Sequence, residues 1–397
     1  MTPNAPHIVV IGGGYAGVLA ANHLQQAAHA KITLVNPRPE FVERIRLHQL
    51  AVGNYSATTG YDTVLGDRVR LLVDSVERID APIRQVQLAS GDVVDYDYLL
   101  YAVGSTGGVP TSVPGAAEFA YPLSELEQAQ RLCERLQDIP MSAPVVVVGG
   151  GLTGIEAAGE FAEAGRPVTL ITDVVGASLG DQARRSVVKA LRKLGVTIVS
   201  GPDILVASVG ATDVTLADGT RLPSAVTVWT TGFGVPGLAA ASGLTTDELG
   251  RLITDETLTS VDDDRIVAAG DCASPSGIPL RMSCQAAGPM GIQAANTVLA
   301  RLAGTEPAVL NQAFTGQCVS VGRTYGTVQI AHSDDTPRRL YFGGRTGAAI
   351  KEQVCKATIT FMAKEGRKPG SYFWFKGRNR ARQLAEAAKD TVGAARR

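Results

Sequence analysis

Two stretches of the chain share one pattern of hydrophobic and polar positions. Residues 7–36 and 144–173 each begin with a run of β-branched residues, continue through a glycine-rich loop into an alanine-rich stretch, and end in a second apolar run. A short apolar run bounded by glycine is typical of a buried parallel strand, and the alanine-rich stretch favours a helix. The pattern therefore predicts two strand–loop–helix–strand units of an α/β fold with parallel sheets.

The loops of the two units have the same glycine spacing, GGGYAG at 12–17 and GGGLTG at 149–154. In such a loop the first glycine permits a tight turn, the second lets the backbone approach a pyrophosphate, and the third allows the helix to pack closely on the strand. The start of the helix adds the positive end of a dipole. We therefore expect two dinucleotide sites, with loop contacts at Gly12, Gly14, Tyr15, Ala16 and Gly17 in the first and at Gly149, Gly151, Thr153 and Gly154 in the second.

The last residue of each second strand is expected to meet the adenosine ribose of its nucleotide. Asn36 and Asp173 follow the third glycine at the same distance in sequence, so the two units align without a gap. Asp173 suits a free 2′-hydroxyl and would repel a 2′-phosphate, which favours NADH. Arg184 and Arg185 lie downstream and keep NADPH as the alternative. Asn36 can hydrogen-bond a ribose, although it is not the usual acidic residue.

Two dinucleotide sites in one chain are typical of a flavoprotein, in which one site holds FAD and the other holds the nicotinamide nucleotide that reduces it. Glycines at the ends of later strands are expected near the same cofactors, at Gly104, Gly232 and Gly270. Asp271 is placed to accept a hydrogen bond from the ribityl chain of FAD, and its simpler role is the N-cap of a helix. The alternative to two working sites is that one unit is an empty Rossmann unit.

Composition and charge exclude several classes of function. The chain has 397 residues, 45% of them hydrophobic, which predicts a folded protein of more than one domain. With 37 Lys and Arg against 38 Asp and Glu, it has no overall basic field for nucleic acid. We recognise no signal peptide and no apolar run that would span a bilayer. The five cysteines include no CxxC pair, so we expect a cytoplasmic protein without a metal site or disulfide framework.

The order of the motifs resembles that of the two-dinucleotide-binding-domain flavoproteins. Within these, the chain is most similar to the type II NADH dehydrogenases and to the ferroptosis-suppressor and apoptosis-inducing-factor-like proteins. The motifs that carry the resemblance are GGGYAG at 12–17, YAVGS at 101–105, GGGLTGIE at 149–156, WTTGFG at 229–234 and AAGDCAS at 268–274. The resemblance implies an FAD-dependent NAD(P)H dehydrogenase. Such an enzyme passes a hydride from NADH to the flavin, and then two electrons to a quinone or a similar small acceptor.

The resemblance also implies the domain organisation. The fold is expected to be α/β, with two Rossmann-like dinucleotide-binding domains, and with the NAD(P)H domain inserted in the FAD domain. The FAD-binding domain would comprise 1–105 and 232–302, the NAD(P)H-binding domain 106–231, and a C-terminal region 303–397.

Four side chains are expected near the flavin by analogy with the family. Glu156 follows the second loop and matches a family glutamate close to the flavin and the nicotinamide, although the helix dipole also favours a first-turn glutamate. Arg44, Arg46 and His48 lie in a segment expected along the isoalloxazine, and solvated charges on a helix are the alternative. We expect Arg44 to bind cofactor, and Glu156, Arg46 and His48 to be catalytic.

The segment after the GD motif bears on the electron acceptor. Type II dehydrogenases carry a sequence resembling AQxAxQQG there, along the quinone tunnel. Gln285 matches it and is expected to be catalytic, whereas Pro289 and Met290 replace the tandem glutamines. Two other functions therefore stay open: a pathway-specific FAD-dependent oxidase or dehydrogenase of an organic substrate, and a slow NADH-sensing flavoprotein. A thiol–disulfide relay is not expected, because no redox cysteine pair is present.

The C-terminal residues 363–397 are basic, with ten Lys or Arg and three acids, and they contain an aromatic run at 372–375. Aromatic side chains beside basic residues suit the surface of an anionic membrane. The tail is therefore expected either to make a peripheral contact with the cytoplasmic face of the membrane, or to pack its aromatic run on the flavin domain. The sequence leaves the oligomeric state open.

Overall fold

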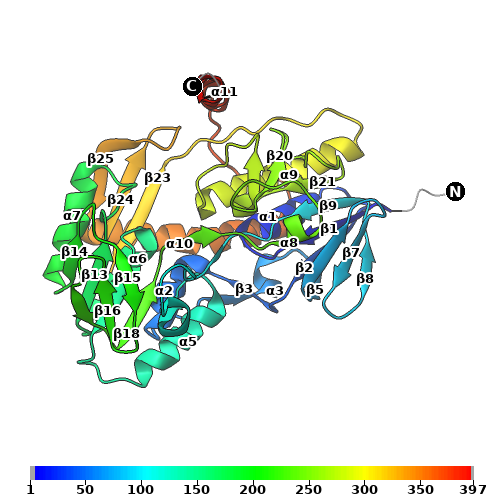
Figure 1. Ribbon diagram of the computed structural model, residues 1–397. Coiled ribbons are helices and arrows are strands. Elements are labelled where there is room, and N and C mark those ends of the chain that lie inside the picture. The colour runs from blue at the N-terminus through cyan, green and yellow to red at the C-terminus, as the bar shows by residue number, and fades with distance from the viewer. Residues whose placement is uncertain (1–4, 395–397) are drawn as a thin grey trace.

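The computed structural model describes residues 5–394, and Figure 1 shows their arrangement. Residues 1–4, where a signal peptide would begin, lie outside the described residues, as do Arg396 and Arg397 of the basic tail. The described chain forms two parallel five-stranded sheets, at the right and the left of Figure 1, and several smaller sheets. This mixed α/β architecture confirms the fold class that the two repeated units predict.

The first parallel sheet is built from chain segments that flank the second sheet in sequence. Its strand order is β21-β9-β1-β2-β5, and each neighbouring pair is parallel. The strands are β1 (His7–Ile11), β2 (Lys31–Asn36), β5 (Val69–Val73), β9 (Tyr98–Tyr101) and β21 (Ile266–Ala268). Because β21 returns to this sheet after the second sheet is complete, residues far apart in sequence meet at its carboxyl ends.

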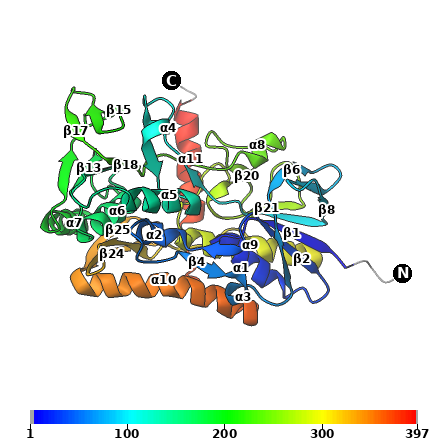
Figure 2. The same cartoon turned by 90° about the horizontal axis from the view of Figure 1, so that it is seen from below.

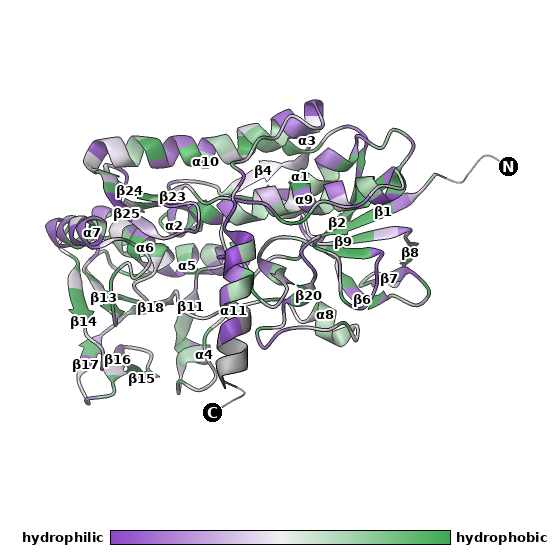
Figure 3. Cartoon of the chain, turned by 90° about the horizontal axis from the view of Figure 1, so that it is seen from above, coloured by the Kyte–Doolittle hydropathy of each residue, from purple (hydrophilic) through white to green (hydrophobic). Residues whose placement is uncertain are grey.

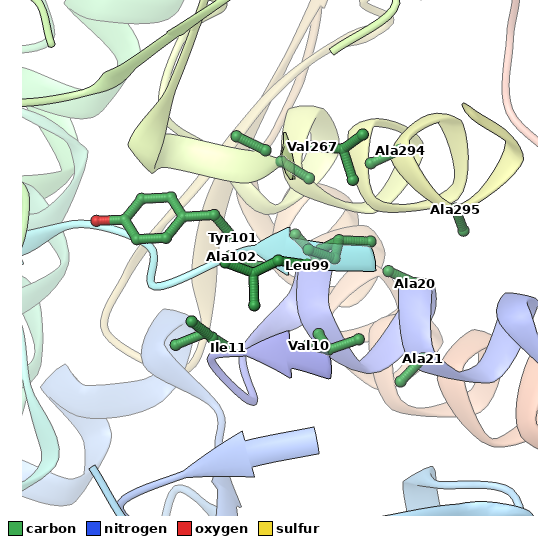
Figure 4. Packing of buried hydrophobic residues seen from close by; sticks show 14 of the residues in the cluster. Val10, Ile11, Ala20, Ala21, Leu99, Tyr101, Ala102, Val267, Ala294 and Ala295 are labelled. Atoms are coloured by element: carbon green, nitrogen blue, oxygen red, sulfur yellow. The ribbon is translucent and has the colours of Figure 1, made fainter. Parts of the chain in front are cut away.

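Two helices, α1 (Tyr15–Leu24) and α9 (Cys284–Leu302), pack on this sheet and on each other. Figure 4 shows Ala20 of α1 and Ala294 of α9 in the cluster that surrounds Leu99 of β9. Small residues allow the helices to approach closely, since a Cβ at Gly291 would lie 2.3 Å from the carbonyl oxygen of Ala16. The alanine-rich pattern is therefore needed for packing as well as for helix formation.

The second parallel sheet repeats this design, with the strand order β11-β18-β12-β13-β14. Its strands are β11 (Ala120–Pro122), β12 (Val145–Val148), β13 (Val168–Thr172), β14 (Thr197–Ser200) and β18 (Val226–Trp229). The helices that pack around it are α5 (Leu126–Gln137), α6 (Leu152–Glu163) and α7 (Asp181–Lys193). All four valines of β12 are buried, as expected for the central strand of a sheet covered on both faces.

Short elements connect and cover the two large sheets. The paired strands are β3 (Glu40–Val42) with β4 (Thr58–Gly60), β10 (Thr106–Gly107) with β19 (Phe233–Gly234), and β20 (Leu252–Thr254) with β22 (Ala273–Pro275). The three-stranded sheets are β6 (Val76–Asp80), β7 (Gln85–Leu88) and β8 (Val93–Asp95), and β15 (Val206–Val209), β16 (Asp213–Leu216) and β17 (Arg221–Pro223). The short helices are η1 (Arg44–Arg46), α2 (Leu47–Ala51), α3 (Tyr61–Val64), α4 (Ala116–Phe119), α8 (Leu238–Ala241) and η2 (Gly270–Cys272). The β10–β19 pair lies where the chain leaves the first sheet and later returns to it.

The C-terminal part adds an antiparallel sheet and two helices. The elements are β23 (Gly316–Val321), β24 (Tyr325–Ala331), β25 (Pro337–Gly343), α10 (Gly344–Arg367) and α11 (Arg380–Ala394). Figure 2 shows α10 running from β24 to α3, so it joins the C-terminal sheet to the first parallel sheet. Figure 3 shows hydrophilic and hydrophobic residues alternating along α10, as expected for a helix with one face in water. Within the described residues, no helix has the length and apolar character to cross a membrane.

Candidate dinucleotide and electron-transfer site

A cleft of about 340 Å³ opens at the carboxyl ends of the strands of the first sheet. This is the edge at which open parallel sheets bind ligands. The predicted residues that line it are Gly12, Gly14, Tyr15, Ala16, Asn36, Arg44, Gly104, Gly270 and Asp271. The cleft therefore brings together residues from four separate parts of the sequence.

The backbone conformation of both loops requires glycine at the first and third positions of the motif. Gly12 and Gly149 have φ angles of 101° and 115°, a region that side chains disfavour. A Cβ at Gly17 would lie 1.8 Å from the carbonyl oxygen of Gly12, and a Cβ at Gly154 would lie 1.8 Å from that of Gly149. The two loops thus share the close helix–strand contact that the sequence pattern predicts.

The middle glycines leave the helix starts open to a ligand. At Gly14 and Gly151, the N-caps of α1 and α6, a Cβ would meet no atom within 4 Å. No described side chain caps either helix, so the first backbone N–H groups are free to bind an anion. These features fit the pyrophosphate groups of two dinucleotides.

The first loop is also held by side chains. Asn36 Oδ1 accepts a hydrogen bond from the N–H of Gly13 at 2.9 Å, and Asn36 Nδ2 donates to the carbonyl oxygen of Arg38 at 2.9 Å. The Tyr61 hydroxyl donates to the carbonyl oxygen of Gly13 at 2.8 Å. Asn36, predicted to meet a ribose, therefore lies at the cleft and fixes the loop as well. Sequence reasoning missed Tyr61, because its short helix carries no motif.

A chain of polar groups lies along the wall of the cleft. Arg44 donates through Nη1 to the carbonyl oxygen of Ser105 at 2.8 Å and through Nε to that of Ser124 at 3.0 Å. The Ser105 hydroxyl donates to Asp271 Oδ2 at 2.7 Å. Arg44 and Asp271, which we expected to contact the flavin, are thus linked through a serine that the sequence did not single out.

Arg38 joins the cleft wall to α5. Its Nε donates to Glu127 Oε1 at 2.6 Å, and its Nη2 donates to Glu125 Oε2 at 3.0 Å. The bond from Arg38 lowers the pKa of Glu127. Arg38 and Glu125 both line the cleft, so this ion pair closes the cleft from the side of the second sheet.

The second loop has a more open surrounding. Asp173 is exposed, and its Oδ1 accepts hydrogen bonds from the N–H of Val174 at 2.6 Å and from the Thr172 hydroxyl at 3.1 Å. Thr153 and Gly232 line a small hollow beside this loop. Arg185 is exposed, while Arg184 pairs with Asp181.

Glu156 lies in a buried cluster of charged groups. Its Oε1 is 3.1 Å from Lys351 Nζ on α10, and it accepts hydrogen bonds from the Ser320 N–H at 3.0 Å and the Ser320 hydroxyl at 3.2 Å. Burial opposes both charges, but each charge stabilises the other: the pKa of Glu156 is lowered, and that of Lys351 is raised well above its ordinary value. The structure therefore holds a protonated lysine in a dry position.

Arg46 and His48 lie behind the cleft and do not line it. Arg46 is 2% exposed and pairs with Glu43 and Glu352. His48 Nδ1 is 3.6 Å from Glu156 Oε2. The alternative of solvated helix charges thus does not apply to these two residues, and their catalytic role stays a prediction.

Gln285 lies in the first turn of α9, after the N-cap Ser283. Its Nε2 donates to the Thr315 hydroxyl at 2.5 Å, and its backbone carbonyl oxygen accepts a hydrogen bond from Gln312 Nε2 at 2.9 Å. The Oε1 atom is buried without a partner among the described residues. Pro289 and Met290, which replace the family glutamines, are buried in α9.

The comparison with known families decides the identity of the chain. Residues 6–297 match the model of the family described as pyridine nucleotide-disulphide oxidoreductase. The chain belongs to this family. It is an FAD-dependent NADH oxidoreductase, and the two glycine loops carry the features that its two dinucleotides require.

Several similar proteins support this placement. An NADH dehydrogenase-like protein of Mycobacterium tuberculosis is 33% identical over 328 residues, covering 74% of this chain and 80% of that protein. A type II NADH:quinone oxidoreductase of Staphylococcus epidermidis is 25% identical over 398 residues, covering 89% and 95%. The sulfide:quinone oxidoreductase of Aquifex aeolicus has the same fold, with a TM-score of 0.77 at 20% identity, covering 91% and 92%.

The cysteines of this oxidoreductase do not form a disulfide. All five are free, and burial raises the pKa of Cys355 to about 11. A buried thiol that stays protonated is a poor nucleophile.

Proposed function

We propose that this oxidoreductase passes two electrons from NADH through FAD to a quinone. The observation that supports a quinone is the buried pair of Lys351 and Glu156. Reduction of a quinone to a quinol consumes protons together with electrons, whereas a protein carrier with a metal centre takes electrons alone. A lysine that stays charged in a dry position holds a proton for such an acceptor. The relatives named type II NADH:quinone oxidoreductases also favour this acceptor.

The proposed division of the chain follows the two loops. Residues 1–105 and 232–302 would bind FAD, 106–231 would bind NADH, and 303–397 would form the C-terminal region. The return of β21 to the first sheet and the large cleft at its edge support this division. The proposed FAD contacts are Gly12, Gly14, Tyr15, Ala16, Gly17, Asn36, Arg44, Gly104, Gly270 and Asp271. The proposed NADH contacts are Gly149, Gly151, Thr153, Gly154, Asp173 and Gly232.

When bound, FAD accepts a hydride from NADH and gives two electrons to the acceptor. The chain itself contributes position and protons. Lys351 would donate a proton to the oxygen of the acceptor, and Glu156 keeps the lysine charged and oriented. Ser320 fixes Glu156 through its N–H and its hydroxyl. Lys351 is within electrostatic reach of Cys284 at the start of α9, a helix whose Ala287 lines the cleft.

An anaerobic titration tests the acceptor. The purified yellow protein is reduced with NADH and then mixed with menadione, a soluble quinone. We expect the flavin absorbance to return at once, and the Lys351→Met variant to reoxidise at least about tenfold more slowly because its proton donor is gone. Lys356→Met is the matched control, because Lys356 lies on the same helix with 61% of its side chain exposed. If the wild-type flavin is reoxidised only by air, the acceptor is another compound.

We also propose a peripheral membrane contact through the C-terminal region. Phe373 and Phe375 are 75% and 61% exposed, whereas Tyr372 and Trp374 pack against the hydrophobic core around the first parallel sheet. Trp374 Nε1 donates to the carbonyl oxygen of Asn311 at 3.0 Å. The aromatic run thus has one side in the protein and the other side exposed, within a basic stretch of sequence that would attract an anionic bilayer.

Sedimentation with anionic vesicles tests this contact. The double variant Phe373→Ser/Phe375→Ser removes only the exposed side, so it leaves the packing of Tyr372 and Trp374 in place. We expect it to lose most of the vesicle binding while keeping its FAD. Equal binding of the variant and the wild type would remove the proposal.

A further inference from the structure

A second carboxylate lies one helical turn beyond Glu156, with a histidine between the two. Glu160 is 1% exposed and His48 is 3% exposed, and the i, i+4 spacing places both carboxylates on one side of α6. His48 comes from α2, which lies against α6 (Figure 1). His48 Nδ1 is 3.6 Å from Glu156 Oε2, and His48 Nε2 is 4.0 Å from Glu160 Oε1. The three groups form a short row that ends at Lys351.

The neighbours of His48 determine which ring nitrogen carries the proton. Arg46 Nη1 donates to Gln49 Oε1 at 3.2 Å. Because a guanidinium has no acceptor, the Gln49 amide cannot be turned around, and its NH₂ group must face His48 Nε2, at 3.4 Å. Nε2 therefore accepts a hydrogen bond, and the proton of the neutral ring sits on Nδ1, toward Glu156. Arg46, which we expected near the flavin, thus sets the tautomer of His48 through Gln49.

Burial and the neighbouring charges give the two carboxylates of the row different affinities for a proton. Burial lowers the pKa of His48 to about 4, so the ring is neutral at neutral pH. Burial raises the pKa of Glu160, whereas Lys351 holds the pKa of Glu156 low despite its burial. The charged groups that face the row are Arg46, Arg323, Lys351, Glu163 and the two carboxylates themselves. Glu160 therefore binds a proton more readily than Glu156, which is kept as a carboxylate.

Glu160 is buried, but its hydrogen-bond partners reach the surface. Its Oε2 accepts a hydrogen bond from Asn54 at 3.0 Å, and its Oε1 accepts one from Arg323 at 3.4 Å. Asn54 is exposed, and 39% of the Arg323 side chain is exposed. One side chain therefore separates Glu160 from solvent on this side of the row.

We propose that Glu160 and His48 form a proton inlet that recharges the Lys351–Glu156 pair during turnover. The inference rests on the proposed quinone function. Quinone, NADH and one proton yield quinol and NAD⁺, so the hydride brings one hydrogen with both electrons, and water must supply the other as a proton. The proton moves from Glu160 to His48 Nε2, the ring releases its Nδ1 proton to Glu156 Oε2, and Glu156 reprotonates Lys351. A half-turn of the imidazole then points the Nε2–H group toward Glu156 and the bare Nδ1 toward Glu160, so the ring can pass the next proton in the same direction. Glu160, His48 and Arg46 are positioning and relay residues in this scheme.

The test compares acceptors that do and do not take protons. Glu160→Gln keeps a hydrogen-bonding side chain but cannot carry the proton. NADH turnover is measured with menadione and with ferricyanide, which takes electrons alone, between about pH 6 and pH 9. We expect the ratio of menadione to ferricyanide turnover to fall about tenfold in the variant, with the larger loss at high pH, where protons are scarce. Glu160→Asp should restore most of the ratio.

Glu134→Gln is the control, because Glu134 is an exposed carboxylate on α5 that is not among the groups facing the row. Its ratio and pH profile should match the wild type. An unchanged ratio and pH profile in Glu160→Gln would overturn the inlet while leaving the quinone function in place. Absence of menadione turnover in the wild type would instead refute the proposed function.

Two further measurements keep the inlet testable if Glu160→Gln does not load FAD. His48→Gln interrupts the row at its centre and should cause the same selective loss with menadione. In the wild type, the rate of flavin reoxidation by menadione is measured in mixtures of H₂O and D₂O. We expect this rate to vary non-linearly with the D₂O fraction, because more than one proton moves. A linear dependence together with a normal ratio in His48→Gln would show that protons reach Lys351 by another route.

Discussion

The two glycine loops share a sequence pattern and a backbone, yet their surroundings differ. Side chains from several elements surround the first loop: Asn36 and Tyr61 bind its backbone, Arg44 lines the cleft, and Arg38 joins the cleft wall to α5. The second loop is open, and Asp173 at the end of its second strand is exposed. The cavities also differ in size, with about 340 Å³ at the first loop and about 10 Å³ in the hollow beside the second.

This difference suits the tasks of the two nucleotides. FAD has to remain bound over many turnovers, so side chains from several elements enclose its proposed site. NADH has to leave as NAD⁺ after each turnover, so its proposed site relies on the loop and on a few exposed groups. The same strand–loop–helix–strand unit thus occurs twice in the chain, and the two copies differ in the groups that surround them. Four substitutions test this comparison.

The largest effect is expected from alanine at the first glycine of each loop. At Gly12 the new Cβ would lie 2.3 Å from the carbonyl oxygen of Ala102, and the backbone there cannot move without moving β9. At Gly149 the Cβ would meet side-chain atoms of Thr230 and Thr231 at 2.6 and 2.5 Å, and these can rotate away. Both variants carry backbone strain of about 1–3 kcal/mol.

We therefore expect Gly12→Ala to be purified largely without FAD, and with a lower melting temperature than Gly149→Ala. Gly149→Ala should keep its FAD and show a higher KM for NADH. The readouts are the flavin absorbance per protein and a thermal melt. Equal FAD content in both variants would show that the enclosure of the first loop does not depend on this backbone contact.

An intermediate effect is expected at the exposed end of the second unit. Asp173→Ala removes a carboxylate that suits a free ribose hydroxyl and repels a 2′-phosphate. The KM for NADH should rise about tenfold, the loss of roughly one good hydrogen bond, and the preference should shift toward NADPH. Steady-state kinetics with both nucleotides measure the shift. Unchanged constants for both would place the ribose elsewhere.

The smallest effect is expected from Arg38→Met, which breaks the ion pair that closes the first cleft. Because Arg38 is 29% exposed, the pair contributes only about 0.5 kcal/mol, and FAD should dissociate about twofold faster. Fluorescence of the released flavin after dilution gives the rate, and added salt should reduce the difference from the wild type. Arg221→Met, which breaks an exposed pair with Asp213 far from the cleft, is the control.

Much of the fold could be predicted because it depends on local pattern. The two strand–glycine–helix units were predicted from apolar runs and a fixed glycine spacing, and both units form as expected. The residues that the first loop brings to the cleft were predicted for the same reason. Tyr61, Ser105 and Arg38 were missed, because each lies outside any motif and reaches the cleft only through the packing of a separate element.

The charged row around Glu156 shows the limit of sequence reasoning most clearly. Glu156 lies in a recognisable motif, whereas Lys351 lies 195 residues later in a helix whose sequence is that of an ordinary amphipathic segment. The structure also places Arg46 and His48 behind the cleft, in contact with carboxylates of other elements. The chemistry of these groups depends on burial and on neighbours that the sequence does not reveal.

The sequence by itself therefore determined the two nucleotide-binding units, their order and the glycines that shape them. These features arise from interactions between residues that are neighbours along the chain, or that repeat with a fixed period. Only the tertiary structure decided that side chains from several elements surround the first loop while Asp173 beside the second is exposed, and that Lys351, Glu156, His48 and Glu160 form one row. The physical reason is that enclosure, desolvation and charge pairing are set by segments distant in sequence, which meet only when the sheets and helices pack.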